Sequence, residues 1–427
     1  MAATIANVAM NTRMRANFAP AKCNAAGKKG WKRRTMHVCG VAAPPRQSQM
    51  GTSDEFEDVL RSGLEGVALV QDKTFPSQAE VLRSIPKHCM EKNTAKSMAY
   101  AATSVALTLG CLAVGHLIPL KLAFLPVWML YAAVTGTVAT GCWVIAHECG
   151  HGAFSDNAFL QDAVGFVLHS ALLVPYFSWQ RSHAIHHART NHMTEGETHV
   201  PHVAGTKAGD GSKERKEKMG EPIYTVVRLF THLVFGWPAY ILFGATGGPK
   251  YGTTNHFWPY APFSGKLFPG KWKQKVLFSA AGVFAMVGVL TWWAKTAGVL
   301  AVAALYGGPL LVANFWLVLY TWLQHTDVDI PHFDKDNWTF IKGAFHTVDR
   351  PYGPVLDFLH HRIGSTHVAH HVNSTIPHYN AVEATNALKE KYPEHYLFDP
   401  TPIHKAMWRV ASKCIAVEKR GNMYVFK

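Results

Sequence analysis

Cysteine pairs with the spacing of a redox or zinc motif are missing from this sequence. It has 7 cysteines and no CxxC pair. Cys23 and Cys39 lie near the N-terminus, whereas Cys111 and Cys142 lie in apolar stretches. Neither a disulfide framework nor a zinc knuckle is therefore indicated, and a reducing compartment is the simpler expectation.

Acidic residues are absent before Asp54, and the first 50 positions carry 9 of the chain's net +14 charges. Because the excess charge sits in one terminal segment, no nucleic-acid partner is expected. An acid-free, basic N-terminus without an apolar core region predicts an organelle transit peptide over residues 1–50. The alternative is a basic arm lying on anionic lipid. A polar segment at 51–94 then precedes a single domain at 95–427.

Charged residues are almost absent from four runs of membrane-spanning length. About 20 apolar residues cross a bilayer, and a soluble helix that is apolar on every side would be unusual. Short connections predict that the runs form two helical hairpins. The expected fold class is an all-α integral membrane protein with four transmembrane helices, interfacial helices and a polar helical cap rich in histidine. The four runs are 95–117, 122–146, 276–294 and 297–320.

Two further apolar stretches, 163–177 and 225–245, are expected to lie in the membrane interface without crossing. The histidine clusters described next can act together only from one face, so an even number of crossings must separate them. Lysine and arginine are concentrated in the loops on that side. The positive-inside rule therefore places the clusters in the cytoplasm, or in the stroma or matrix after import.

Histidine is abundant, with 25 residues, and eight of them fall into three clusters. On a helix, positions i, i+3 and i+4 share a face, so each cluster is expected to aim its imidazoles at one point. Buried without a metal, the unpaired ring nitrogens would cost about 1–3 kcal/mol each. Neutral imidazole suits iron, copper and zinc. The predicted metal ligands are His147 and His151; His183, His186 and His187; and His367, His370 and His371.

The first cluster also fits the H-E-x-x-H pattern of zinc proteases, with Glu148 as general base. A zinc site needs only three protein ligands and a water, which would leave the other clusters idle. Eight nitrogens instead fit two metals with about four each and positions open to O₂, which favours a redox di-iron centre. Haem binding would require isolated histidines facing each other between spans. A zinc membrane protease or a metal transporter remains the alternative class.

At these residues the chain resembles the membrane-bound fatty acid desaturases, and within them the plant, algal and fungal omega-6 and omega-3 acyl-lipid group. The resemblance runs from about residue 85 to the C-terminus. It implies a four-span helical fold with all eight clustered histidines as iron ligands, and it suggests His325 as a ninth. The segments that carry it are 146–157, 172–179, 323–326, 347–350 and 366–379.

The resemblance implies that two iron ions and O₂ as co-substrate introduce a cis double bond into an 18-carbon acyl chain of a membrane glycerolipid. The protein then has to position the chain and exclude water, and no catalytic side chain beyond the metal centre is expected. Two electrons come from a separate protein, because the sequence has no His-Pro-Gly-Gly motif of a fused cytochrome b5. The donor would be ferredoxin in a plastid or cytochrome b5 in the endoplasmic reticulum.

The position of the double bond is less well marked. Segment 86–89 and His192 resemble omega-3 members, although fungal omega-6 enzymes share the latter feature. Segments 366–369 and 405–409 resemble the endoplasmic omega-6 branch. The basic N-terminus favours a plastid omega-3 enzyme that converts linoleate to α-linolenate in a chloroplast membrane, envelope or thylakoid. The alternatives are an omega-6 enzyme of the endoplasmic reticulum, which converts oleate to linoleate, and a hydroxylase variant.

Overall fold

The computed structural model describes residues 74–426. The predicted transit peptide at 1–50 lies outside these residues, as does residue range 51–73 of the polar segment. The described part of that segment contains helix α3 (Gln78–Ser84), which begins with a reciprocal capping box between Ser77 and Glu80. The turn η1 (Lys87–Met90) follows it.

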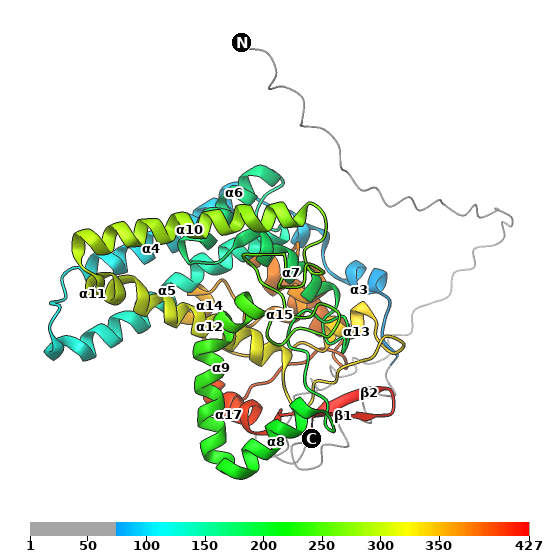
Figure 1. The fold of residues 1–427 in the computed structure, drawn as a ribbon. Helices are drawn as coiled ribbons and strands as arrows, with labels where there is room; N and C mark the ends of the chain where they lie inside the picture. Colours follow the sequence, from blue (N-terminus) through cyan, green and yellow to red (C-terminus); the bar gives the residue numbers. More distant parts are fainter. Residues whose placement is uncertain (1–73, 427) are drawn as a thin grey trace, which may run out of the picture. The chain divides into compact units, whose positions relative to one another are not determined.

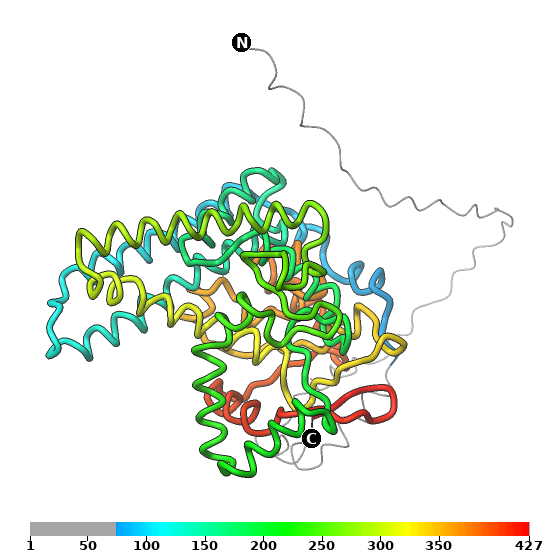
Figure 2. Tube along the Cα trace, viewed as in Figure 1, coloured from blue at the N-terminus to red at the C-terminus, as the bar shows by residue number. Residues whose placement is uncertain are grey.

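Four long helices correspond to the four predicted spans and run in nearly the same direction (Figures 1 and 2), and the second of them packs against the first and the fourth. The first two are joined by residues 116–124, which include the turn η2 (Leu122–Phe124). The last two are joined at Gly298, followed by α11 (Val299–Val302) and the π-helical turn η3 (Ala303–Gly307). Both predicted hairpins are therefore present. The four helices are α4 (Thr94–Gly115), α5 (Leu125–His151), α10 (Trp272–Ala297) and α12 (Gly308–His325).

Helices α5 and α12 pack closely because Gly136 has no side chain. A Cβ atom at Gly136 would lie 2.4 Å from the carbonyl oxygen of Pro309, so only glycine permits this approach. One turn away, the Tyr131 hydroxyl donates a hydrogen bond to the Leu305 carbonyl oxygen in the π-helical turn, at 3.0 Å. The last turns of the two helices carry His147 and His151 on α5 and His325 on α12.

The number of membrane crossings stays a prediction. By length and composition, the described residues contain five helices that could cross a membrane, the fifth being α9 (Glu221–Phe243). In Figure 1, α9 runs across the direction of the four long helices. Helices α6 (Ala158–Ala171) and α7 (Tyr176–Ala188) pass the same test only as a pair, and they are bent by 105°. The two stretches predicted to be interfacial fall in α9 and around this bend.

The cap consists of short helices and a small strand pair. The strands β1 (Val417–Arg420) and β2 (Met423–Phe426) are antiparallel, with Val417 opposite Phe426. This strand pair is an addition to a mostly helical fold that agrees with the predicted all-α class, and Met423 and Val425 bury one face of β2 against Phe333. The helices of the cap are α8 (Lys207–Met219), α13 (Phe340–Phe345), α14 (Pro354–Leu359), α15 (His367–Val372), η4 (His378–Asn380), α16 (Ala381–Lys391) and α17 (Ile403–Lys413).

Part of the C-terminal region, by which we mean the cap from α13 onward, lies against the long helices. The Nε2–H of His360 donates to the Thr137 carbonyl oxygen at 2.7 Å, while its Nδ1 lies 2.8 Å from the Tyr320 hydroxyl. The neighbouring His361 has its Nε2 2.9 Å from the hydroxyl of Ser104 on α4. These contacts satisfy buried polar groups on α4, α5 and α12. The C-terminal region is therefore packed between the predicted spans as well as over their ends.

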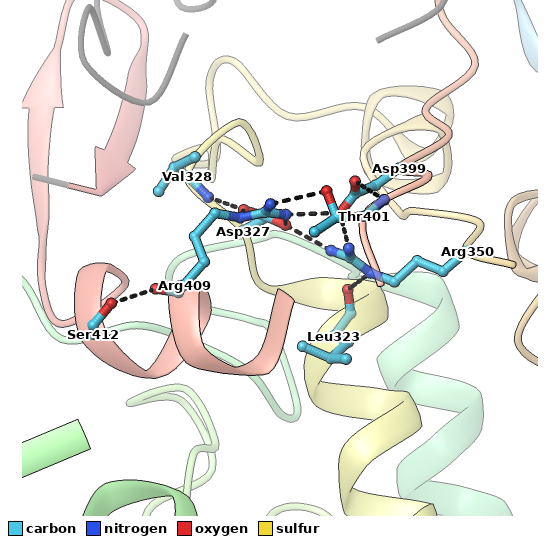
Figure 3. Close-up of polar contacts among 8 residues, drawn as sticks. All are labelled: Leu323, Asp327, Val328, Arg350, Asp399, Thr401, Arg409 and Ser412. Carbon is cyan, nitrogen blue, oxygen red and sulfur yellow. Dashed lines mark hydrogen bonds and ion pairs between the residues drawn. The ribbon is translucent and has the colours of Figure 1, made fainter. Parts of the chain in front are cut away.

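A buried cluster of two arginines and two aspartates fastens the C-terminal region to the end of α12 (Figure 3). Arg350 pairs with Asp327 at 2.6 Å and also with Asp399. Arg409 pairs with Asp327 at 2.5 Å and with Asp399 at 2.7 Å. Burial by itself raises the pKa of Asp327, but Arg409 and Arg350 outweigh it and hold that pKa below its usual value. The Nε–H of Arg350 also donates to the Leu323 carbonyl oxygen, at 3.1 Å.

Asp399→Ala is expected to lower the free energy of unfolding by about 3–5 kcal/mol, because it leaves two buried guanidinium groups sharing one carboxylate. Thermal unfolding of the purified protein in detergent measures the effect. The matched control is Asp334→Ala, which removes an ion pair with the exposed Lys419 and a hydrogen bond from Asn337, and it should change the midpoint far less. Equal shifts in both variants would contradict the role of the buried cluster.

Candidate metal centre

Five histidines form what we call the first cluster, at the point where α5 meets α7 and α15. One ring nitrogen from each lies within 4.8 Å of those of all the others. Two Nε2–Nε2 separations are 3.2 Å, one between His147 and His151 and one between His183 and His187. Both pairs are one helical turn apart, which places their rings on one helix face. The members are His147, His151, His183, His187 and His370.

Four histidines form the second cluster, beside the first. His325, at the last position of α12, has its Nε2 3.1 Å from that of His186 and 2.9 Å from that of His367. His371 has a ring nitrogen within 4.8 Å of those of His186 and His325. The two clusters adjoin, because the rings of His187 and His371 stack at 4.0 Å between centroids. All nine predicted site residues are thus brought together.

The expectation that each sequence cluster aims at one point is wrong for two of the three. On α7, His183 and His187 face the first cluster, whereas His186 faces the second. On α15, His370 belongs to the first cluster, and its neighbours His367 and His371 belong to the second. The physical reason is helix geometry, since adjacent residues point about 100° apart at 3.6 residues per turn. The residues at i+3 and i+4 of these two sequence clusters are adjacent and therefore point to two different clusters.

The nitrogen geometry of both clusters fits a metal ion. Two metal–nitrogen bonds of about 2.0–2.1 Å at a right angle place the nitrogens about 3 Å apart, close to the separations seen here. The buried Nε2 atoms of His370 and His371 have no hydrogen-bond partner among the described residues. Burial lowers the pKa of His370 to about 3, so its ring is neutral and offers a lone pair. The histidine clusters are able to bind metal.

Thr190 orients one of these rings. Its hydroxyl donates to the His186 carbonyl oxygen at 2.7 Å, which leaves an oxygen lone pair to accept the Nδ1–H of His371 at 3.2 Å. With the proton held on Nδ1, the Nε2 of His371 is free to bind a metal. Asp349 fixes the same helix by accepting the Val368 backbone N–H at 2.9 Å. No spacing in the sequence marks Thr190 for this role.

Glu148 lies on the side of His147 that faces away from the first cluster. One carboxylate oxygen is 3.5 Å from the Nδ1 of His147, whereas the Nε2 of that ring faces His151. The other oxygen accepts the His378 backbone N–H at 3.0 Å. A zinc protease needs this glutamate beside the metal-bound water. The placement of Glu148 therefore disfavours hydrolysis.

Other histidines have structural surroundings. The Nδ1 of His192 accepts backbone N–H groups of Thr194 and Glu195, each at 3.2 Å, and thereby closes a turn outside both clusters. His199 lies closer to the centre, where its ring is nearly parallel to that of His325 with centroids 5.2 Å apart. The sequence patterns did not single out His199.

A cavity of about 260 Å³ adjoins the histidines. His183 and His186 line it, as do Trp143 and Trp179, and its remaining walls come from α9, α12 and the loop after α7. The Trp179 ring stacks on that of His183 at 4.4 Å between centroids. The cavity therefore leads from both clusters into the space between α9 and α12.

Comparison with known proteins identifies one family. The family model described as fatty acid desaturase matches residues 123–401. The chain is 41% identical over 347 residues to a Delta(12)-fatty-acid desaturase of Arabidopsis thaliana, covering 80% of this chain and 88% of that protein. It is 42% identical over 346 residues to an endoplasmic reticulum omega-6 fatty acid desaturase of Glycine max, with 80% and 88% covered. A Delta(12) fatty acid desaturase of Mortierella alpina is 38% identical over 363 residues, with 82% and 90% covered.

Thr190→Val is expected to weaken metal binding about 10–100-fold, because it keeps the shape of the side chain but removes the acceptor that orients His371. Metal content after dialysis against a graded series of chelator concentrations measures the loss. Thr103→Val is the matched control, since the Thr103 hydroxyl is exposed and bonds only within its own helix. Metal retention equal to that of the unaltered protein would refute the orienting role of Thr190.

Proposed function

Because this chain belongs to the membrane fatty acid desaturase family, we propose that it is an omega-6 acyl-lipid desaturase that converts oleate to linoleate in membrane glycerolipids. As a family member it is an oxidoreductase and a multi-pass membrane protein that acts on lipid. The proposal rests most on one observation, the convergence of nine imidazoles into two adjoining clusters beside a cavity.

The omega-6 assignment replaces the omega-3 preference of the sequence patterns. The relatives named above are Delta(12) or omega-6 desaturases, and none of these names supports an omega-3 plastid enzyme. The segments at 366–369 and 405–409, which resemble the omega-6 branch, agree with them. His192, which had favoured omega-3, closes a turn outside both histidine clusters.

Two iron ions are the proposed cofactors, one in each cluster. The five histidines of the first cluster and the four of the second, His325 included, are their proposed ligands. When bound, the irons supply the oxidising power, drawn from O₂, that removes hydrogen from unactivated CH₂ groups. Imidazole ligands alone suit several metals, so iron is inferred from the family and from the number of ligands. Zinc hydrolysis is not proposed, because of the position of Glu148.

The cavity is the proposed site for the reacting part of the acyl chain. Its volume of about 260 Å³ can hold only a segment of such a chain. Phe235 and Thr231 on α9 are exposed at its edge, which would let a lipid enter from the bilayer. Trp143 and Trp179 shield the histidines, and the protein's contribution is then to hold two adjacent carbons beside the metals and to keep water out.

Endoplasmic reticulum membrane is the proposed location, with cytochrome b5 as electron donor. The Glycine max relative is named as an endoplasmic reticulum enzyme, and this supports the alternative location over the chloroplast, and cytochrome b5 over ferredoxin. The proposed topology has four spans, with α9 and the α6–α7 bend in the interface. The cap then faces the cytoplasm. Removal of the basic segment at 1–50 as a transit peptide stays a prediction, outside the described residues.

Replacing any one of the nine histidines by alanine is expected to abolish desaturation and to lower iron per protein, while the protein still inserts into membranes. Each substitution removes a metal ligand outside the apolar cores of the helices. Fatty acid analysis of expressing yeast and metal analysis of the purified protein measure the two effects. His116→Ala, in the exposed connection after α4, is the control and should retain both. Normal product from any two of the eight variants other than His325→Ala would contradict the di-iron model. Normal product from His325→Ala would contradict its assignment as the ninth ligand.

Yeast that expresses this chain is expected to form linoleate from its own oleate and to leave added linoleate unchanged. The measurement is gas chromatography of total fatty acids with and without added linoleate. Formation of α-linolenate only when linoleate is supplied would restore the omega-3 reading. A hydroxylated product would instead indicate the hydroxylase variant.

A further inference from the structure

Glu197 is a buried acid that no cation neutralises. Its side chain is 3% exposed, and both carboxyl oxygens lie within hydrogen-bond distance of the Tyr240 hydroxyl, at 2.8 and 2.9 Å. Among residues 74–426, no lysine, arginine or histidine forms an ion pair with it. Burial raises the pKa of Glu197 to about 8, although the hydrogen bond from Tyr240 opposes the shift. At neutral pH the group is therefore a carboxylic acid that carries a proton.

Glu197 lines the cavity that adjoins the candidate metal centre. Glu197 is the only acid among the described residues that line the cavity, which it shares with His183 and His186. The adjacent Thr198 also lines the cavity, and its hydroxyl lies 2.8 Å from that of the exposed Thr246. The acid thus shares one cavity with two histidines of the clusters and with a hydroxyl pair of which Thr246 is exposed.

Further hydrogen bonds connect Tyr240 with the residue before His183. The Tyr240 hydroxyl that bonds Glu197 is also 2.8 Å from the hydroxyl of Ser182, the residue before His183. His256 reaches the same serine, with its Nε2 3.1 Å from the hydroxyl oxygen. The other titratable groups that face this region are His199 and His232, which line the cavity. None of them is an acid, so Glu197 alone can hold a carboxylic proton here.

Desaturation by O₂ consumes protons, and these protons have to be delivered to the cavity. Each turnover removes two hydrogen atoms from adjacent carbons and breaks the O–O bond. Two electrons from the carrier protein and two protons from water complete the reduction of O₂ to two water molecules. Protons cannot cross an apolar cavity unaided, since every proton needs a chain of groups that accept and donate it. The electron carrier supplies none of these groups inside the cavity.

We propose that Glu197 relays these protons from the aqueous side, through Thr198 and Thr246, to the part of the cavity beside His183 and His186. The proposal rests on the function proposed above. A purely structural role is the competing explanation, because the bond to Tyr240 also ties the loop after α7 to α9. The two explanations differ in what a glutamine does at this position: its amide oxygen can accept the same hydrogen bond, but it has no acidic proton to pass on.

The decisive comparison uses the iron-loaded enzyme with its electron carrier and three variants. Glu197→Gln is expected to lower the desaturation rate at least about tenfold with iron content and thermal midpoint unchanged, and Glu197→Asp to recover most of the rate. Glu195→Gln is the matched control, since Glu195 pairs with Arg189 and Lys250 outside the cavity. The rate of the unaltered enzyme should fall as pH rises through about 8, and Glu197→Gln should lack this decline.

An infrared titration tests the acid without any turnover, and on metal-free protein. The unaltered protein should show a carboxylic-acid C=O band that disappears as pH rises through about 8, and Glu197→Gln should lack it. Absence of this band in the unaltered protein overturns the proposal, even if Glu197→Gln does not fold. A normal rate and pH profile in Glu197→Gln, or an equal loss of rate in Glu197→Asp, also overturns it. If the unaltered enzyme makes no desaturated lipid, the proposed function itself has failed.

Discussion

Nine imidazoles converge in two adjoining clusters, with ring nitrogens 2.9–3.2 Å apart in the tightest pairs, and the rest of the structure depends on this constraint. Each ring offers a lone pair to the same small space, which favours a bound cation and disfavours the empty arrangement. No single helix can present nine such rings. The chain brings them from four helices that lie far apart in sequence, namely α5, α7, α12 and α15.

The link between α12 and α15 shows how this convergence is secured. Two consecutive residues, Asp349 and Arg350, bind different helices. The Asp349 carboxylate accepts the backbone N–H of Val368 at the start of α15, while Arg350 donates to the Leu323 carbonyl oxygen near the end of α12. Arg350 is fully buried and is compensated by the aspartates of the cluster in Figure 3. Burying charged groups usually lowers the stability of a fold. Here the buried charged cluster sets the position of His325 relative to the histidines of α15.

The same region separates two environments of the site. On one side, His360 and His361 bond to groups of the long helices, so the C-terminal region closes the bundle beneath the clusters. On the other side, Glu197 lines the cavity between α9 and α12, which is the proposed site for the acyl chain. An oxidising metal centre needs both features, because the acyl chain must reach it while bulk water is kept out.

Periodicity and composition determined much of this protein from the sequence alone. Four charge-poor runs longer than about 18 residues gave the long helices and their pairing into hairpins, because a bilayer requires such lengths whatever the packing. Histidine spacing picked out eight of the nine histidines that converge, and the resemblance to a family supplied His325. Both rest on local rules, which hold before the chain has folded.

Only the tertiary structure decided how the histidines are divided between the two clusters and which other residues lie beside them. The division of His186 from His187 between the two clusters depends on which neighbouring helix each ring meets. Thr190 and Glu197 form hydrogen bonds with partners far away in the sequence, on α15 and α9. Such contacts produce no repeating pattern in the sequence. A single hydrogen bond across the fold constrains only the two residues that form it, and not their neighbours in the chain.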